Sequence, residues 1–292
     1  MSSGWIMIIL MMELGLFFFV FMCMEYNLLS IARSCLKYFM IQSVSSLLLL
    51  VSGLLLFSML DLPSWLVHLF FLVGVTLKLG AFPMLFWVIP VLGELPFILI
   101  GMVGCPLKVL PLMMYSAYYA SCNPPVGVNG MNFISLLTMV SGVWLGLHVK
   151  TTRGMLGASS ISHTGWFILS THSASIMKYF MCYAVSLIMV LYYLWGQNSF
   201  MGALNLLGLA GLPPFSVFVG KIIVVYTSLR SNISEVFLML AMLVSAVSLF
   251  YYLKFSFSMY LYNSNVMPHK FSFAGYFPFM VNCAFALLFL CV

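Results

Sequence analysis

The chain has 292 residues, of which 64% are hydrophobic, and eleven Lys or Arg and five Asp or Glu give a net charge of +6. A soluble globular domain has roughly 25% charged residues, so the 5% found here could not solvate a folded surface of this size. The composition excludes a soluble enzyme and a disordered chain. The positive residues form no cluster, which argues against a nucleic-acid-binding domain. What remains is a polytopic membrane protein.

Ten apolar runs separated by polar breaks predict about ten transmembrane helices. These runs cover approximately residues 5–30, 36–59, 63–88, 96–119, 131–149, 154–172, 176–197, 200–228, 233–261 and 274–292. They do not alternate apolar and polar residues as barrel strands do, so the predicted fold class is all-α. In the first run, Glu13 marks an alternative helix start, and the place of residues 1–12 stays open. Basic residues gather in the odd-numbered loops, which predicts that both termini lie outside.

Several charged residues fall inside these spans, where they are costly. Glu25, Lys78, Lys108 and Lys221 lie well inside, and Lys254 lies eight residues from the end of its span. A Lys at a helix centre costs about 2.5–3.5 kcal/mol, so three of them cost about 8–10 kcal/mol if left unsolvated. Such residues typically face a water-filled cavity or pair with counter-charges, and they mark ion or proton paths. Two alternatives stay open: Lys254 could reach the interface through its long stem, and Glu25 could sit at the end of its helix.

Helix breakers accompany each of the three central lysines. All lie within ten residues of a lysine, namely Gly80 and Pro83 after Lys78, Pro106 and Pro111 around Lys108, and Gly211, Pro213 and Pro214 before Lys221. Proline removes a backbone donor and frees carbonyl groups. Non-helical backbone at membrane depth is tolerated only where protein or trapped water satisfies it, as at the ion sites of transporters.

The spacing of the polar residues suggests an internal repeat. Glu25, Lys78 and Lys108 are separated by 53 and 30 residues, and His163, Lys221 and Lys254 by 58 and 33. The first series uses predicted helices 1, 3 and 4 and the second uses 6, 8 and 9, so the offset is an odd number of helices. The second copy would enter the membrane from the opposite side, as in inverted-repeat transporters.

We therefore predict one transmembrane domain over residues 1–292. Its first half would cover about 5–119 and its second half about 131–261, with an extra C-terminal helix at about 274–292. His163 lies among hydroxyl residues, and an imidazole there suits a proton relay, although a packing role stays open. The seven scattered cysteines show no paired spacing, so we interpret them as apolar fillers and expect no metal or haem site.

Three segments resemble a known family. They are Lys78-Leu-Gly-Ala-Phe-Pro-Met-Leu-Phe-Trp87, Ser160-Ile-Ser-His-Thr-Gly-Trp166, and Gly211-Leu-Pro-Pro-Phe215 continuing to Lys221. Together with Met24-Glu-Tyr-Asn27, they resemble NADH–ubiquinone oxidoreductase chain 2, the antiporter-like membrane-arm family of respiratory complex I. Two positions depart from the family pattern. Leu85 replaces a polar residue, and Val91 in Ile89-Pro90-Val91 stands where the family has a Glu, so whether Glu94 substitutes for that Glu stays open.

The resemblance implies a proton-translocating subunit, multi-pass in the mitochondrial inner membrane and N-terminally shortened, with two discontinuous helices. It pairs Glu25 with Lys78 and assigns the proton-transfer axis to Glu25, Lys78, Lys108, His163 and Lys221, with Lys254 as a weaker member. It implies no cofactor in this chain, whereas the whole complex uses NADH, FMN, iron–sulfur clusters and ubiquinone. Expected partners are other membrane-arm subunits, including neighbouring antiporter-like ones, and lipids such as cardiolipin, but no nucleic acid.

The proposed mechanism is a row of titratable sites joined by water. Movement of Glu25 relative to Lys78 would change how tightly the lysine holds its proton, which could then pass toward Lys108 and Lys221. The energy would come from redox chemistry elsewhere in the complex. Two rival interpretations remain: a free-standing cation/proton antiporter of the same fold, and a membrane scaffold whose polar residues are relics.

Overall fold

The structure is a computed structural model that describes residues 2–57, 63–121, 126–171, 175–196, 199–231, 233–263 and 273–290. The predicted span ends at residues 58–59, 172, 197 and 291–292 lie outside these ranges. Within them, all regular structure is α-helical. The helices are α1 (Ser2–Met24), α2 (Leu29–Phe57), α3 (Ser64–Leu79), α4 (Val88–Glu94), α5 (Phe97–Gly104), α6 (Pro106–Ser121), α7 (Val126–His148), α8 (Thr152–Thr171), α9 (Ile176–Trp195), α10 (Ser199–Ala210), α11 (Ser216–Arg230), α12 (Glu235–Asn263) and α13 (Phe273–Leu290).

The all-helical membrane fold is confirmed. Six helical stretches in the described residues are long and apolar enough to cross a membrane, namely Gly4–Met24, Leu29–Leu56, Phe97–Tyr118, Gly130–His148, Ile176–Trp195 and Glu235–Leu261. Within the predicted span at 63–88, α3 ends at Leu79, and α4 follows only from Val88. The predicted span at 200–228 is divided into α10 and α11, and the one at 96–119 into α5 and α6, which are separated by Cys105 alone. The α3–α4 and α10–α11 breaks are the two predicted discontinuous helices, and they lie at the glycine and proline residues.

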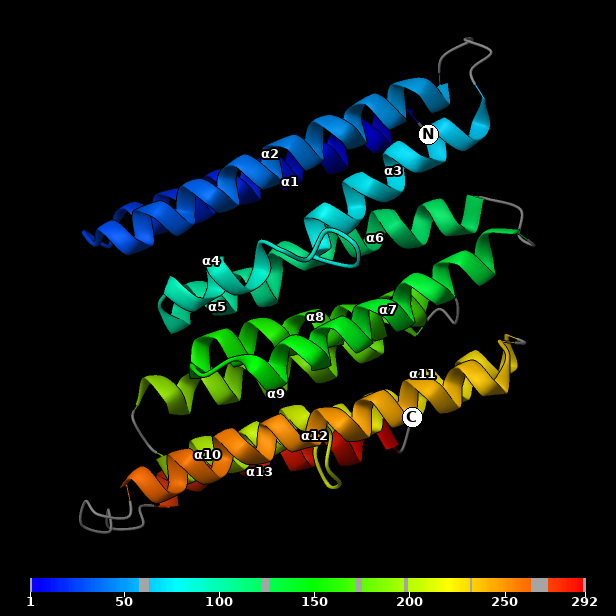
Figure 1. Cartoon of the computed structure of the whole chain (residues 1–292). Helices are drawn as coiled ribbons and strands as arrows, with labels where there is room; N and C mark the ends of the chain where they lie inside the picture. Colours follow the sequence, from blue (N-terminus) through cyan, green and yellow to red (C-terminus); the bar gives the residue numbers. More distant parts are fainter. Residues whose placement is uncertain are drawn as a thin grey trace.

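The helices run side by side along one common direction (Figure 1). They follow the chain across the bundle, with α1 and α2 at one edge and α10 to α13 at the other. Neighbours in contact include α1 with α2, α2 with α3, α7 with α8, and α9 with α11. The start of α1 and the end of α13 lie toward the same side of the bundle (Figure 1).

Helix α8 is the most enclosed element that the structure describes. Every residue from Gly154 to Thr171 is buried, although the helix carries several hydroxyl groups. Close packing against α7 makes this possible, because a Cβ atom at Gly142 would lie 2.6 Å from the backbone nitrogen of Ser162, and one at Gly165 would lie 2.7 Å from the backbone oxygen of Ser135. Small residues that let helix backbones approach closely are typical of membrane helix packing. These glycines allow α8 to pack closely against α7 in the middle of the bundle.

The first helix corrects one expectation. Helix α1 runs without interruption from Ser2 to Met24, so Glu13 lies near its middle and does not begin it. Residues 2–12 belong to the helix because they continue the apolar run, and one carboxylate among so many apolar residues does not break helical hydrogen bonding. Glu25, by contrast, lies in the exposed turn between α1 and α2. The alternative that places Glu25 at the end of its helix is therefore correct.

Candidate functional site

Lys78 lies in the last turn of α3, where the helix is interrupted. Gly80 ends the helix in the left-handed conformation, with φ of 69°, which glycine adopts without a steric penalty. The carbonyl groups left free at this end find donors from other elements. Gln42 Nε2 donates to the Lys78 carbonyl at 3.3 Å, and Trp87 Nε1 donates to the Leu77 carbonyl at 3.0 Å. The break is thus satisfied by protein groups, as non-helical backbone in a membrane requires.

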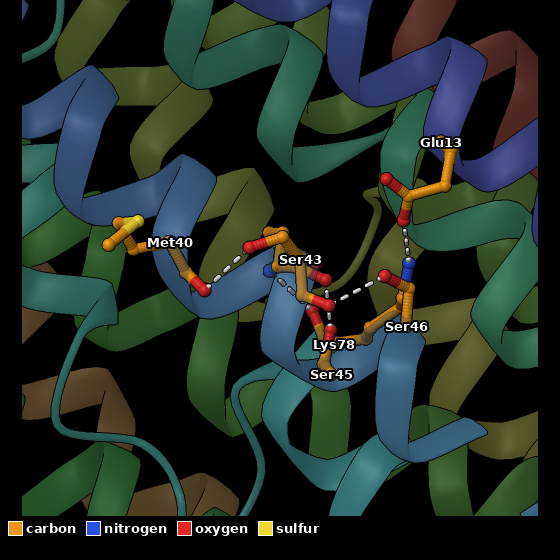
Figure 2. A network of polar contacts seen from close by, with 7 residues as sticks. Glu13, Met40, Ser43, Ser45, Ser46 and Lys78 are labelled. Carbon is orange, nitrogen blue, oxygen red and sulfur yellow. Dashed lines mark hydrogen bonds and ion pairs between the residues drawn. The ribbon is translucent and has the colours of Figure 1, made fainter. Parts of the chain in front are cut away.

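The side chain of Lys78 is almost completely buried and pairs with Glu13. Its Nζ lies 3.7 Å from Glu13 Oε1, with the two side chains 2% and 31% exposed. Figure 2 shows Glu13 reaching from α1 toward the lysine ammonium. The predicted pairing of Lys78 with Glu25 is therefore wrong in this structure. The reason is geometric, because Glu13 lies at mid-helix, level with Lys78, whereas Glu25 lies beyond the end of α1.

Helix α2 places a row of hydroxyl groups near the Lys78 break (Figure 2). Ser45 Oγ donates to the Gln42 carbonyl at 2.6 Å, and Ser46 Oγ donates to the Ser43 carbonyl at 2.7 Å. These bonds stay within the helix, so the serines tolerate burial without partners from α3. They give the α2 face next to Lys78 several buried hydroxyl groups.

Lys108 lies in the first turn of α6, just after a second interruption. Helix α5 ends at Gly104 and α6 begins at Pro106, whose ring nitrogen has no hydrogen to donate. The Lys108 residue is 5% exposed, and its Nζ donates to the Ser160 carbonyl of α8 at 3.2 Å. Lys108 is therefore buried at the contact with the central helix, as predicted from its flanking prolines.

A cavity of about 250 Å³ separates the Lys78 and Lys108 regions. Its lining includes Lys78, Gln42 and Tyr38 on one side and Pro106 and Leu107 of α6 on the other. A water molecule occupies about 30 Å³ of liquid volume and needs polar partners. The cavity has room for several waters, with the lysine, the amide and the phenol as polar walls.

His163 occupies the middle of the enclosed helix α8 and is 3% exposed. Its ring nitrogens face two tyrosines from different helices. Nδ1 lies 2.8 Å from the Tyr179 hydroxyl of α9, and Nε2 lies 3.5 Å from the Tyr252 hydroxyl of α12. The charges of both Lys221 and Lys108 act on the imidazole. His163 is thus a central polar residue between two buried lysines.

Lys221 of α11 completes the second discontinuous helix. Its Nζ donates to the Ala210 carbonyl, at the end of α10, at 3.0 Å. An ammonium is stabilised there by the negative end of the helix dipole, by about 0.3–1 kcal/mol or more when buried. Its Nζ also lies 5.8 Å from the ring centre of Trp166, within cation–π range. Gly211, with φ of 86°, makes room for it, since a Cβ there would lie 3.0 Å from Nζ.

A small enclosed cavity joins His163 to Lys221. It measures about 10 Å³, and its walls include both residues together with Ser162, Ser248 and Tyr252. A polar cavity holds one water once it offers about 10–15 Å³. This cavity is at that limit and has several polar walls, so it is matched to a single bridging water.

Lys254 differs from the other candidate lysines. It lies on an exposed face of α12. The structure therefore leaves it outside the buried row that contains Lys78, Lys108, His163 and Lys221. Lys254 lies in an uninterrupted helix, where no freed carbonyl group draws its ammonium inward.

Sequence reasoning missed three of the polar residues that the structure brings to the site. Glu13 could have been found as a charged residue inside a span, although not as the partner of Lys78, because its run is apolar on both sides and long enough to form one helix. Tyr179 and Tyr252 carry no sequence signal, since the chain has 15 tyrosines and only packing brings these two to His163. Within the described residues, no group of three or more His, Cys, Asp or Glu side chains could hold a metal ion.

The apolar spans and two discontinuous helices, each with a buried lysine next to its break, define the chain as an α-helical, multi-pass membrane protein. No family model matches it. NADH-ubiquinone oxidoreductase chain 2 of Albinaria caerulea, however, is 36% identical over 288 residues, which cover 98% of this chain and 92% of that protein. The chain belongs to the NADH-ubiquinone oxidoreductase chain 2 family.

Solved structures show the same fold. A chain of respiratory complex I from Thermus thermophilus with bound Aureothin superposes with a TM-score of 0.72 at 21% identity, over 90% of this chain and 68% of that one. A chain of the Mrp complex from Dietzia sp. DQ12-45-1b gives a TM-score of 0.66 at 16% identity, over 78% of this chain and 50% of that one. At these identities the similarity establishes the fold alone.

Proposed function

We propose that this chain is a proton-translocating membrane-arm subunit of respiratory complex I in the mitochondrial inner membrane. Protons would move along a buried, water-linked row formed by Lys78, Lys108, His163 and Lys221, with Glu13 as the carboxylate that acts on Lys78. Oxidation of NADH and reduction of ubiquinone elsewhere in the complex would drive the movement. FMN and iron–sulfur clusters would belong to other subunits.

The observation that carries this proposal is the burial of the three lysines. They are each 5–6% exposed in a chain with 5% charged residues, and each meets a specific polar group. Burying these lysines in a membrane costs several kcal/mol. A purely structural role would not require that cost, because apolar side chains could fill the same positions. One cavity has room for water beside Lys78 and extends to Pro106 and Leu107, and the other joins His163 to Lys221. Groups that can hold or release a proton, separated by water, are the parts that a proton path needs.

We further infer that the two discontinuous helices belong to related halves, over about 5–119 and 131–261, in inverted orientation. Each break has a glycine with positive φ, Gly80 or Gly211. Each also has a buried lysine: Lys78 lies in the last turn before the first break, and the Nζ of Lys221 donates to the Ala210 carbonyl at the second. Transporters with inverted repeats place such breaks around a site near the bilayer midplane. Helix α13, from Phe273 to Leu290, would be additional to both halves.

Substitution of the buried lysines tests the proposal. Lys78→Met and Lys221→Met keep the length of the side chain but remove the charge. We expect the complex to assemble with either variant and to lose most of its NADH-driven proton pumping, measured as proton uptake into vesicles per assembled complex. Lys254→Met is the matched control, because this lysine lies on an exposed face. Normal pumping with Lys78→Met or Lys221→Met would refute the assignment.

A free-standing cation/proton antiporter is the second candidate, since the fold is shared with a chain of the Mrp complex. Hard cations prefer clustered carboxylates, and the described residues contain no acidic cluster. Cation transport by the purified chain alone would favour this candidate. A scaffold role would be favoured if the lysine variants lost assembly but the complexes that formed pumped normally.

A further inference from the structure

Lys108 and His163 share no direct contact among the described residues, and neither of the two cavities described above is lined by both of them. Lys108 reaches the carbonyl of Ser160, which lies almost one helical turn before His163 in α8. The hydrogen-bonding partners described for the imidazole are Tyr179, Tyr252 and the backbone of Leu209. A proton leaving Lys108 therefore needs a further group to reach His163.

Tyr183 of α9 lies in this interval. Its ring centre is 4.7 Å from that of His163, and the side chain is 1% exposed. Phe167 packs edge-on against the ring with a centre separation of 5.4 Å, which holds the phenol in place. The hydroxyl lies 3.7 Å from the point where a Cβ atom would stand on Gly104. Tyr183 therefore extends from the imidazole to the interruption between α5 and α6.

The other end of Tyr183 faces the helix that carries Lys108. Cys105 follows Gly104 and lies within electrostatic range of both Tyr183 and Lys108. On the imidazole side, Tyr183 interacts with Tyr251 and Tyr252, whose ring centres are 4.4 Å apart. The phenol thus connects the Lys108 interruption with the tyrosines around His163.

The hydroxyl of Tyr183 is buried and has no hydrogen-bond partner among the protein groups described. An unsatisfied buried polar group costs about 1–3 kcal/mol, and phenylalanine would fill the same space without that cost. Packing of the aromatic ring therefore does not explain why this residue is a tyrosine and not a phenylalanine. A polar group that is held in place but has no fixed partner can accept and donate hydrogen bonds to mobile water.

We propose that the Tyr183 hydroxyl relays protons between Lys108 and His163. The inference rests on the proposed function. In one transfer, the phenol oxygen accepts a proton from the Lys108 ammonium through water as the phenol releases its own proton toward the imidazole. Lys108 ends neutral, His163 ends as the imidazolium, and Tyr183 keeps one proton throughout. No oxidant or reductant is consumed.

The test compares two tyrosines of the same helix in the assembled complex. Tyr183→Phe removes only the unpartnered hydroxyl, so thermal stability should stay the same or rise. NADH-driven proton pumping should fall about tenfold, the rate effect of losing one hydrogen bond in the transition state, and the solvent deuterium isotope effect should change. Tyr193→Phe is the control. Tyr193 is also buried but hydrogen-bonds the backbone of Phe279, so its variant should lose stability and pump normally.

Three outcomes would overturn the relay: parental pumping and an unchanged isotope effect in Tyr183→Phe, an equal pumping loss in Tyr193→Phe, or failure of Tyr183→Phe to assemble. Tyr183→His, which restores a group able to donate and accept protons, should recover part of the rate. Lys221→Met separates this inference from the proposed function. If Lys221→Met abolishes pumping and Tyr183→Phe does not alter it, the relay alone fails, whereas normal pumping in both variants refutes the whole row.

Discussion

Replacing Glu13 with Gln should damage proton pumping, and replacing Glu25 with Gln should not. The first substitution removes the negative charge that lies 3.7 Å from Lys78 and keeps the shape of the side chain. The second removes a charge from an exposed turn. The pair of variants therefore asks which carboxylate acts on the lysine at the first helix break.

The size of the effect follows from the geometry of the ion pair. Two unit charges 3.7 Å apart interact by about 4 kcal/mol at an effective dielectric constant of 20. The Glu13 side chain is 31% exposed, so we discount this energy by half for screening, to about 2 kcal/mol. Each 1.4 kcal/mol corresponds to a factor of ten. Pumping in Glu13→Gln should thus fall about thirtyfold if the charged form of Lys78 takes part in the slow step.

The assay is the initial rate of NADH-driven proton uptake by vesicles that contain the assembled complex, normalised to the amount of complex. Glu13→Asp serves as a second comparison, since it keeps the charge but draws it back by one methylene group. We expect an intermediate rate for this variant. Parental pumping in Glu13→Gln, or an equal loss in Glu25→Gln, would refute the reasoning from the ion pair.

The buried lysines could be predicted because two independent signals coincide at each of them. Lys78, Lys108 and Lys221 combine a charge in an apolar run with nearby glycine or proline residues. The breakers matter physically, since a helix end provides free carbonyl groups and a favourable dipole for an ammonium. Lys254 has the first signal without the second, and the structure places it on an exposed face. The breaker is therefore the better indicator of a lysine that points inward.

The partner of Lys78 could not be predicted by the same means. Selecting Glu13 over Glu25 depends on where α1 begins and how far it slides along α2 and α3, and an apolar run does not specify this register. The tyrosines around His163 are harder still. Tyr179 is 16 residues away in sequence and Tyr252 is 89 residues away, so their contacts arise only when α8, α9 and α12 pack.

Two further substitutions test how the second discontinuous helix is held. Gly211→Ala should destabilise the assembled subunit by about 1–2 kcal/mol, because φ is 86° and L residues are strained there. Gly93→Ala is the control. A Cβ atom at Gly93 would meet no atom within 4 Å, so this variant should be tolerated in the same thermal melt. Equal melting temperatures for the two variants would contradict the strain expected at Gly211. Asn282→Leu should also destabilise by about 1–3 kcal/mol. Asn282 Oδ1 of α13 accepts hydrogen bonds from Ser216 Oγ at 2.6 Å and from the Ser216 backbone N–H at 3.4 Å, which caps the first turn of α11. In a double-mutant cycle, Ser216→Ala should reduce the cost of Asn282→Leu because the two share one interaction. Strictly additive losses would show that α13 does not anchor the helix that carries Lys221.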